Sequence, residues 1–361
     1  MEVDELRKRI NDPKIIGNIV SEIRKVANKV GHVRIMHVCG THEHEIMRFG
    51  LRSLLPPNIE VVAGPGCPVC VTPKRDIDEI IFLSENRIIT TYGDMYGVPS
   101  NRGSLERAKS EGRDIRIVYS VMDAIDIANR EEKEVIHFGI GFETTAPASA
   151  SAIMDAPQNF SILSVHRLIP PAISFLLSQG EIKVDALLDP GHVSTIIGTR
   201  PYESISKRFK IPQVVAGFEP VDILLGIYML LKQIEEGRCE VENEYKRVIK
   251  RKGNIKAKRV MEEVFFVKDA EWRGLQIIPD SGYEIRKKYE DWDARKRFEE
   301  ELKDFVYEDV GDKGCRCSEI LRGLIKPEDC KLFKKVCTPS NPIGACMVSA
   351  EGMCHIAFKF S

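Results

Sequence analysis

Short β-branched segments alternate with helical patterns between about residue 31 and residue 240. Each segment is followed by small or polar residues and then by apolar residues at helical spacing, which is the pattern of βαβ units. The expected strands are 33–38, 59–63, 87–91, 115–119, 135–139, 161–165, 184–188 and 213–216. Because this alternation is typical of parallel sheets covered by helices, we expect an α/β fold.

The expected strands fall into two groups of four along the chain, which indicates two α/β units. A chain of 361 residues is too long for one ordinary hydrophobic core, so two or three domains are expected. We predict a first α/β domain at 31–130, a second at 131–240 and a C-terminal domain at 241–361. Residues 1–30 are interpreted as N-terminal helices, and we expect them to pack against the third domain.

The charge balance excludes several classes of partner. Lysine and arginine number 53 against 54 acidic residues, a formal net charge of -1, which gives no electrostatic case for nucleic acid or an anionic membrane. No uncharged apolar run reaches the length of a membrane span, and the N-terminus lacks the apolar core of a signal peptide. We therefore expect a cytoplasmic protein, in which structural disulfides are rare.

Most expected strands end in a loop rich in glycine, cysteine, histidine or acidic residues. These loops are CGTHEHE (39–45), GPGCPVC (64–70), YGD (92–94), GFETTAP (141–147), VHR (165–167), DPGHVS (189–194) and GFEP (217–220). In parallel sheets, ligands bind beyond the carboxyl ends of the strands. We therefore expect these side chains to gather at the sheet ends, where two facing sheets would enclose a central cleft.

Two of these loops carry reactive thiols. Cys67 and Cys70 form a C-x-x-C motif in a glycine–proline loop before an expected helix, and this motif is typical of a dithiol/disulfide couple or of half a metal site. Cys39 ends a strand and starts a helix in the same way. A helix N-terminus stabilises a thiolate, so we expect lowered thiol pKa values at both loops.

Further polar residues at the strand ends are weaker candidates. His42 follows Cys39 by three residues and shares a helix face with it, so it could lower the thiol pKa or carry protons, or it could be a cap partner. Glu143 could be a general acid/base or part of a helix N-cap cluster with Thr144 and Thr145. For His44, His192 and Glu219, a structural role is about as strongly indicated as a functional one.

The C-terminal tail, residues 314–355, holds six of the ten cysteines: Cys315, Cys317, Cys330, Cys337, Cys346 and Cys354. Such a dense set of soft ligands binds zinc or an iron–sulfur cluster, or forms disulfides. The paired C-x2-4-C knuckles of zinc sites are missing from the tail, and six thiols exceed the four that a cluster needs. The spacing therefore favours a cluster over zinc, with two thiols left for redox work.

The segment between the strands and the tail offers no recognisable chemistry. Residues 241–313 are charge-dense, with helical patterns and one expected hairpin around 265–278. We interpret Trp272 and Trp292 as packing or interface residues. Cys239 lies in a charged segment after a long apolar helix, and we assign it no role.

Five motifs together resemble one known family. CGTHEHE, GPGCPVC, GFETTAP, DPGHVS and the tail GCRCSEILRG…PEDCKLF…CTPSNPIGACMVSAEGMC closely resemble the HypD family of NiFe-hydrogenase maturation proteins. The resemblance runs over essentially the whole chain with the motifs in order. It implies two Rossmann-like parallel α/β domains around a central cleft, plus a third, mainly helical iron–sulfur domain with a 4Fe-4S cluster. It also implies a scaffold, formed with the small chaperone HypC, on which Fe(CN)2CO is built.

The resemblance assigns roles to individual cysteines. It implies that Cys39 holds the iron of Fe(CN)2CO, that Cys67 and Cys70 are the redox pair, and that cyanide comes from HypE, charged by HypF. The implied cluster ligands are Cys315, Cys330, Cys337 and Cys354, and the implied accessory disulfide joins Cys317 and Cys346. We expect a monomer when the chain is free. A general thiol–disulfide oxidoreductase and an interaction scaffold with a structural zinc remain the alternatives.

Overall fold

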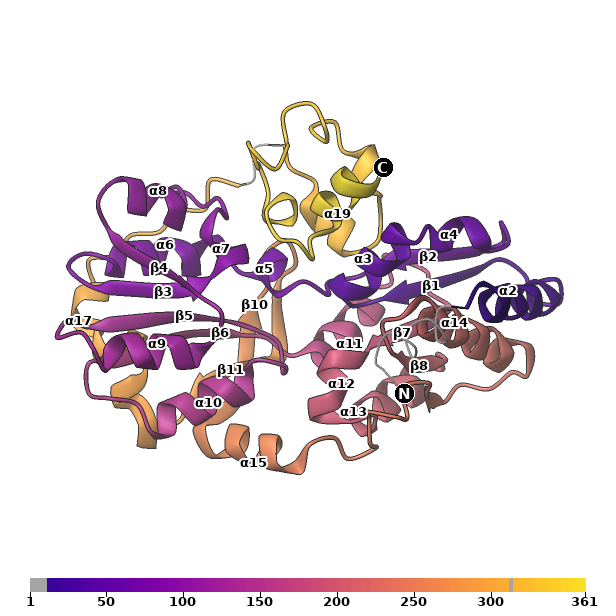
Figure 1. Cartoon of the computed structure of the whole chain (residues 1–361), viewed down its shortest axis with the longest axis horizontal. Helices are drawn as coiled ribbons and strands as arrows, with labels where there is room; N and C mark the ends of the chain where they lie inside the picture. The colour runs from indigo at the N-terminus through magenta and orange to yellow at the C-terminus, as the bar shows by residue number, and fades with distance from the viewer. Residues whose placement is uncertain (1–11, 312–313) are drawn as a thin grey trace.

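The computed structural model describes residues 12–311 and 314–361. It consists of two α/β units side by side, with the C-terminal tail above their junction (Figure 1). The strands that correspond to the predicted ones are β1 Val33–His37, β2 Ile59–Ala63, β3 Ile88–Tyr92, β4 Asp114–Val118, β5 Val135–Gly141, β6 Phe160–His166, β7 Ala186–Pro190 and β8 Gln213–Ala216. Each predicted strand is confirmed to within two residues at either end, because β-branched runs with buried side chains specify strands locally.

The strands form two parallel sheets, and the grouping of strands between them differs from the prediction. One sheet has the order β2-β1-β7-β8-β9, with β9 at Val241–Asn243, and the other has the order β4-β3-β5-β6. We call them sheet A and sheet B. Each sheet draws on both predicted ranges, so the grouping of strands into 31–130 and 131–240 is wrong. The α/β class with parallel sheets is confirmed.

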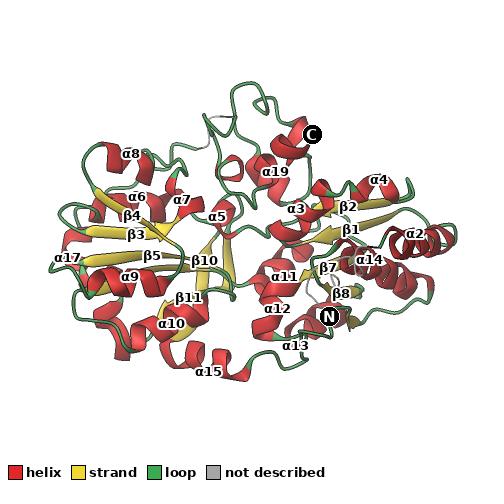
Figure 2. Ribbon diagram, in the orientation of Figure 1, coloured by secondary structure: helices red, strands yellow, loops and turns green. Residues whose placement is uncertain are grey.

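Helices cover both faces of the two sheets (Figure 2). In the first half of the chain they are α2 Pro13–Ala27, α3 Gly40–Arg48, α4 Leu51–Leu54, α5 Pro68–Val71, α6 Lys74–Leu83, α7 Gly93–Tyr96, α8 Leu105–Ser110, α9 Val121–Ala128, α10 Ala146–Met154 and α11 Ile169–Gln179. In the second half they are α12 Gly191–Ile197, α13 Arg200–Phe209, α14 Pro220–Glu235, α15 Ile255–Val264, α16 Ala294–Arg297, α17 Glu299–Leu302, α18 Cys317–Leu321 and α19 Met353–Phe360. The described residues also contain the 3-10 helices η1 Lys287–Trp292, η2 Pro327–Asp329 and η3 Ala345–Met347.

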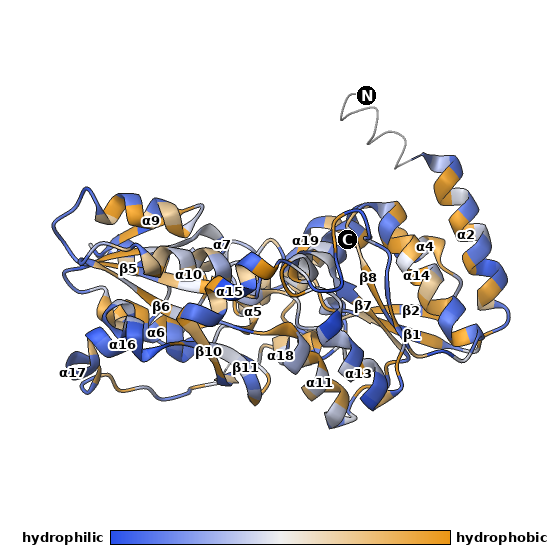
Figure 3. Cartoon of the chain, turned by 90° about the horizontal axis from the view of Figure 1, so that it is seen from below, coloured by the Kyte–Doolittle hydropathy of each residue, from blue (hydrophilic) through white to orange (hydrophobic). Residues whose placement is uncertain are grey.

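The N-terminal helix does not pack where it was expected. Helix α2 carries apolar and polar residues on different faces (Figure 3) and buries Val20, Ile23 and Val26. Those residues join a core cluster with α14 and one face of sheet A. The expected contact of the N-terminal helices with the third domain is therefore wrong for α2, and the other predicted part, residues 1–11, lies outside the described residues.

Residues 241–361 do not form one helical domain. Strand β9 joins sheet A, and the predicted hairpin, β10 Phe265–Glu271 with β11 Ile277–Ile285, packs against β6 and α11. Helix α16 also covers β6, whose seven residues are all buried although it is an edge strand. The tail, residues 314–361, gathers above the junction of the two units as short helices and loops (Figure 1).

Candidate functional site

The carboxyl ends of strands from both sheets meet at one cavity of about 310 Å³. Its walls come from the loops after β1, β2, β5 and β7, from α12 and from the tail: Val38, Cys39, Thr41, Gly66, Pro68, Phe142, Thr144, Pro190, His192, Val193, Thr195, Ile196 and Glu351. We call this space the cleft. Four of the predicted strand-end loops are thus confirmed to converge, as the position of ligand sites in parallel sheets requires.

Cys39 lies at the N-terminus of α3, where it is the N-cap residue. Its thiol is buried, with 6% of the residue exposed, and the nearby backbone N–H groups of His42 and Thr41 favour the thiolate. Burial, followed by the nearby Glu351 carboxylate, raises the thiol pKa to about 12 in spite of these donors. The expected lowering of this pKa is therefore wrong, because desolvation of the thiolate outweighs the helix N-terminus.

The C-x-x-C loop packs directly on Cys39. The Gly40 N–H donates a hydrogen bond to the Gly66 carbonyl oxygen at 3.1 Å, and a Cβ at Gly66 would overlap the Cys39 backbone. Cys67 is the N-cap of α5, and it forms a disulfide with Cys70 across a Cα–Cα distance of 5.3 Å. The glycine thus permits the close backbone approach that brings the pair beside Cys39.

His42 points into the protein beside sheet A. Its Nε2 lies 2.9 Å from the Gly217 carbonyl oxygen, so Nε2–H is the donor, and its ring is 5.2 Å from the Phe218 ring. Burial, followed by the neighbouring His37, lowers the His42 pKa to about 3. The ring is therefore neutral at neutral pH, so it carries no positive charge that could lower the Cys39 thiol pKa. His192 also stacks on Phe218, with 3.8 Å between the ring centroids, and it lines the cleft.

Glu143 is buried behind the cleft wall, between the cleft residues Phe142 and Thr144. Its carboxylate oxygens accept the N–H of Ile169 at 3.2 and 3.3 Å, so the side chain caps the N-terminus of α11. Burial raises the Glu143 pKa to about 8. Glu143 does not line the cleft, so no contact supports the predicted general acid/base role. Its hydrogen bonds to the Ile169 N–H support a structural capping role.

Two residues of the site escaped the sequence analysis. Glu351, in the tail loop SAEG, enters the cleft, and its Oε1 accepts a hydrogen bond from Thr41 Oγ1 at 2.9 Å. Asp189, in the DPGHVS loop, is fully buried, and its carboxyl oxygens have no hydrogen-bond partner among the described residues. Burial raises the Asp189 pKa well above its usual value. A carboxylate at a strand end was the available signal for Asp189; no comparable signal marked Glu351.

The tail brings its cysteines together below α19. Cys317 and Cys346 form a disulfide, and both line a small cavity together with Cys315, Cys330, Cys337 and Cys354. Burial, followed by the neighbouring thiols, raises the pKa of Cys354. In the described residues, no three His, Cys, Asp or Glu side chains have the arrangement of ligands around one metal ion. The 3-10 helix η3, which contains Cys346, packs against α5, which contains Cys70.

The remaining candidates lie outside the cleft. Glu219 is the N-cap of α14, Thr145 is the N-cap of α10, and His44 is hydrogen-bonded to Glu45. Cys239 is exposed, with its Sγ 3.0 Å from the Lys210 carbonyl oxygen. These positions have structural contacts and do not line the cleft.

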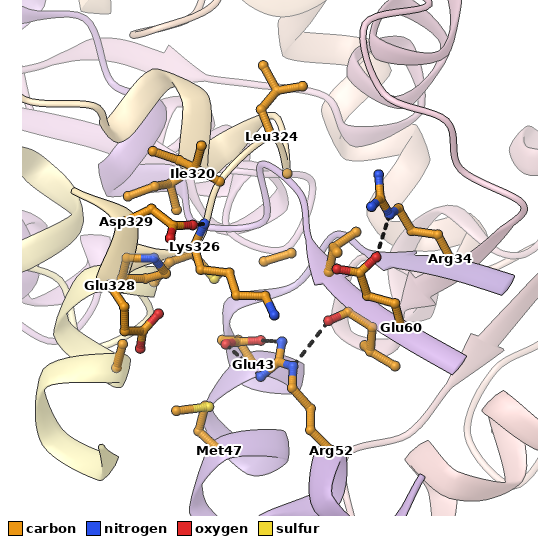
Figure 4. A pocket seen from close by; sticks show the side chains of 18 residues that line it. Arg34, Glu43, Met47, Arg52, Glu60, Ile320, Leu324, Lys326, Glu328 and Asp329 are labelled. Carbon is orange, nitrogen blue, oxygen red and sulfur yellow. Dashed lines mark hydrogen bonds and ion pairs between the residues drawn. The ribbon is translucent and has the colours of Figure 1, made fainter. Parts of the chain in front are cut away.

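A second cavity, of about 420 Å³, lies between β2, α3 and the tail (Figure 4). Its floor carries Glu43, which binds Arg52 through two hydrogen bonds and the buried His37 through a third at 2.8 Å. Burial alone would raise the Glu43 pKa, but the Arg52 charge and the His37 hydrogen bond lower it to about 2. This ion pair fixes α3 and α4 to β1 just before Cys39.

The same motifs are found in known proteins. The family model HypD, described as the hydrogenase formation hypA family, matches residues 14–361. The chain belongs to the HypD family. A protein of Methanocaldococcus jannaschii, provisionally named a hydrogenase expression/formation protein, is 47% identical over 97% of this chain and 98% of its own. The hydrogenase maturation factor HypD of Cupriavidus necator is 44% identical over 98% and 96%. Membership of the HypD family therefore covers the cleft and the cysteine tail alike.

HypD of Rhizobium leguminosarum is also a hydrogenase maturation factor, 44% identical over 98% of this chain and 93% of its own. This chain is accordingly a hydrogenase maturation factor of the HypD family.

None of the helices in residues 12–311 and 314–361 has the length and apolar character needed to cross a membrane.

Proposed function

We propose that the chain acts with HypC as the scaffold on which the Fe(CN)2CO moiety of a NiFe-hydrogenase is assembled in the cytoplasm. The observation that carries this proposal is that Cys39 packs on the Cys67–Cys70 loop, and that the helix of Cys70 packs on the 3-10 helix of Cys346, although these parts are distant in the sequence. Iron that carries cyanide and carbon monoxide is soft, so thiolates are suitable anchors for it.

In this proposal Cys39 and a thiol of HypC hold the iron, which is the substrate. Cys39 lines a cleft of about 310 Å³, large enough for a small iron complex and open to a partner protein. The nearby backbone N–H groups of Thr41 and His42 favour the Cys39 thiolate, so they would stabilise it when iron displaces the proton. HypE, charged by HypF, supplies the cyanide.

The four tail cysteines outside the disulfides suit a 4Fe-4S cluster. Cys315, Cys330, Cys337 and Cys354 line one cavity, and each would bind a different iron, which does not require the arrangement of ligands around a single ion. When bound, such a cluster supplies one electron at a time to neighbouring sulfur. This chain's contribution is to bury that cluster beside the Cys317–Cys346 pair.

Electrons then reach the cleft by thiol–disulfide exchange between the two cysteine pairs. A thiolate of the reduced Cys317/Cys346 pair attacks the Cys67–Cys70 disulfide, and the bond within that disulfide breaks as a mixed disulfide forms. The second tail thiolate then attacks the mixed disulfide and reforms the tail disulfide. Two electrons pass, the tail pair is oxidised, and the released Cys67 and Cys70 thiolates take the protons that the tail thiols lost.

The proposal is tested by infrared spectroscopy of the complex with HypC, purified without oxygen. Cys39→Ala is expected to remove the bands of iron-bound cyanide and carbon monoxide. Cys239→Ala, which changes an exposed thiol far from the cleft, is the matched control and should keep them. Unchanged bands in Cys39→Ala would refute the assignment of Cys39 to iron.

The nearness of two disulfides also favours a general thiol–disulfide oxidoreductase as a second candidate. Burial speaks against it, because Cys67 and Cys70 are only 0% and 1% exposed and a protein substrate could not reach them in this conformation. Steady-state reduction of a model disulfide by the purified chain would support that candidate.

A structural zinc in the tail is distinguished by metal and acid-labile sulfide analysis, since a zinc protein contains no such sulfide and is colourless.

A further inference from the structure

The tip of the β10–β11 hairpin, residues 272–276, lies where sheet B, the C-x-x-C helix and the tail meet. Its base is anchored by Trp272, which is 1% exposed. The indole stacks on Phe142 with 5.9 Å between ring centroids, and its Nε1–H donates a hydrogen bond to Ser281 Oγ at 2.8 Å. These contacts fix the tip relative to the loop after β5, which forms part of the cleft wall.

The next residue joins the tip to the C-x-x-C helix. The backbone N–H of Arg273 donates to the carbonyl oxygen of Val71 at 2.8 Å, and its guanidinium donates to the Pro99 carbonyl oxygen at 3.3 Å. Val71 is the last residue of α5 and directly follows Cys70. The hairpin therefore holds the C-terminal end of the short helix that carries the disulfide.

Gly274 joins the tip to the tail. It has a φ of +75°, and an added Cβ would lie 2.9 Å from the Cβ and 3.0 Å from the Cα of Ser318. Ser318 directly follows Cys317 at the start of α18. There is no room for a side chain between the tip and this helix, so Gly274 sets how closely α18 approaches.

We propose that the hairpin tip is a positioning element that sets the separation between the Cys67–Cys70 and Cys317–Cys346 pairs. Consecutive tip residues touch the residue after Cys70 and the residue after Cys317, while Trp272 holds the tip on sheet B. The inference rests on the proposed function, in which one pair reduces the other by exchange. Sulfur must approach the disulfide in a defined geometry, so a small displacement slows the reaction.

The direct packing of α5 against η3 agrees with this role, because η3 carries Cys346. All four sulfur-bearing residues are at most 7% exposed, which limits the access of small thiols to the inner pair. Cys317 is the most exposed of the four, so an added reductant enters through the tail. Reduction of Cys67–Cys70 then reports how well the two pairs are aligned.

The test uses Gly274→Ala in the full-length protein, with Gly237→Ala as its matched control. Gly237 also has a positive φ, +65°, but nothing lies within 4 Å of an added Cβ, so it reproduces the backbone strain without the contact. Each protein is treated anaerobically with dithiothreitol, quenched in acid and alkylated. Mass spectrometry then gives the reduction rate of each pair separately.

In Gly274→Ala we expect the tail pair to be reduced at the rate of the parent, and the Cys67–Cys70 pair to be reduced at least about tenfold more slowly. Gly237→Ala should match the parent at both pairs. Equal Cys67–Cys70 rates in the two glycine variants would overturn the positioning role. Cys317→Ser separates this from the proposed function: if removing that thiol leaves the Cys67–Cys70 rate unchanged, the pairs do not communicate and the electron route fails.

Discussion

Gly66 lies against the backbone of Cys39, and the two are joined through the Gly40 N–H, which donates to the Gly66 carbonyl oxygen. This contact brings the C-x-x-C loop to the thiol that we propose to hold iron. It depends on the absence of a side chain at Gly66, because a Cβ there would overlap the main chain of Val38 and Cys39, which cannot move without shifting β1.

Gly66→Ala is therefore expected to separate the loop from Cys39 and to destabilise the fold by about 2 kcal/mol, as overpacking of a rigid site does. Urea denaturation gives the change in the free energy of unfolding, and infrared spectroscopy of the HypC complex gives the loss of iron–cyanide bands. Gly31→Ala is the control, since an added Cβ at Gly31 meets nothing within 4 Å. Equal unfolding free energies and equal iron–cyanide bands in Gly66→Ala and Gly31→Ala would contradict the role of this contact.

Arg52→Met should destabilise the protein because it leaves the buried Glu43 carboxylate without its cation. Both oxygens of Glu43 are bound by Arg52, at 3.0 and 2.7 Å (Figure 4), and only 9% of the Glu43 side chain is exposed. We expect a loss of about 2 kcal/mol, measured by urea denaturation. In the double variant Arg52→Met/Glu43→Gln, most of this loss should be recovered, because no buried charge remains. Arg48→Met, on the exposed side of α3, is the control.

The strands could be predicted from the sequence because each is specified locally, by a buried run such as Val135–Gly141. Their grouping could not, since the pairing of β1 with β7 is decided by crossover connections that leave no periodic signal. The cleft cysteines were predicted for a related reason: strand ends in parallel sheets converge whichever sheet they belong to.

The electrostatics of the site depended on burial, which the sequence does not give. The helix N-terminus at Cys39 was recognised, but desolvation reverses its effect on the thiol pKa. Glu143 was recognised as polar at a strand end, but only the structure shows that its oxygens face the Ile169 N–H. Glu351 was missed because its contact with Thr41 joins a tail loop to α3 across most of the chain.

Buried histidines should make the protein less stable as the pH falls. Burial lowers the pKa of His137 to about 4, below the unfolded value of about 6.5. The neutral His137 ring contributes its full share to the free energy of unfolding above pH 6.5. This contribution is lost as the pH falls towards 4, because the unfolded chain binds the proton first. His137→Gln should flatten the fall in unfolding free energy by about 1 kcal/mol per pH unit between pH 6 and 5.

The comparison between parent and variant isolates His137 in these measurements. Glu143, whose raised pKa has the opposite effect on stability over this pH range, is present in both proteins and cancels. Urea denaturation at pH 7.5, 6 and 5 gives the two slopes. His32→Gln, at an exposed position outside the elements, should leave the slope of the parent unchanged. Parallel slopes for parent and His137→Gln would show that this ring is not held neutral.

Asp189→Asn should stabilise the protein at neutral pH. Burial raises the pKa of the Asp189 carboxyl, whereas in the unfolded chain it ionises near pH 3.9. Its contribution to stability is therefore fully present below pH 3.9 and is lost as the pH rises, because the unfolded chain releases the proton first. Asparagine cannot ionise, so the variant should be more stable than the parent at pH 7.5. This gain should shrink as the pH approaches 4. Asp155→Asn, which changes a carboxyl at an exposed position, is the control and should show no such gain. A loss of stability in Asp189→Asn at pH 7.5 would contradict the prediction, because it would mean that the Asp189 carboxyl is ionised and bound in the native protein.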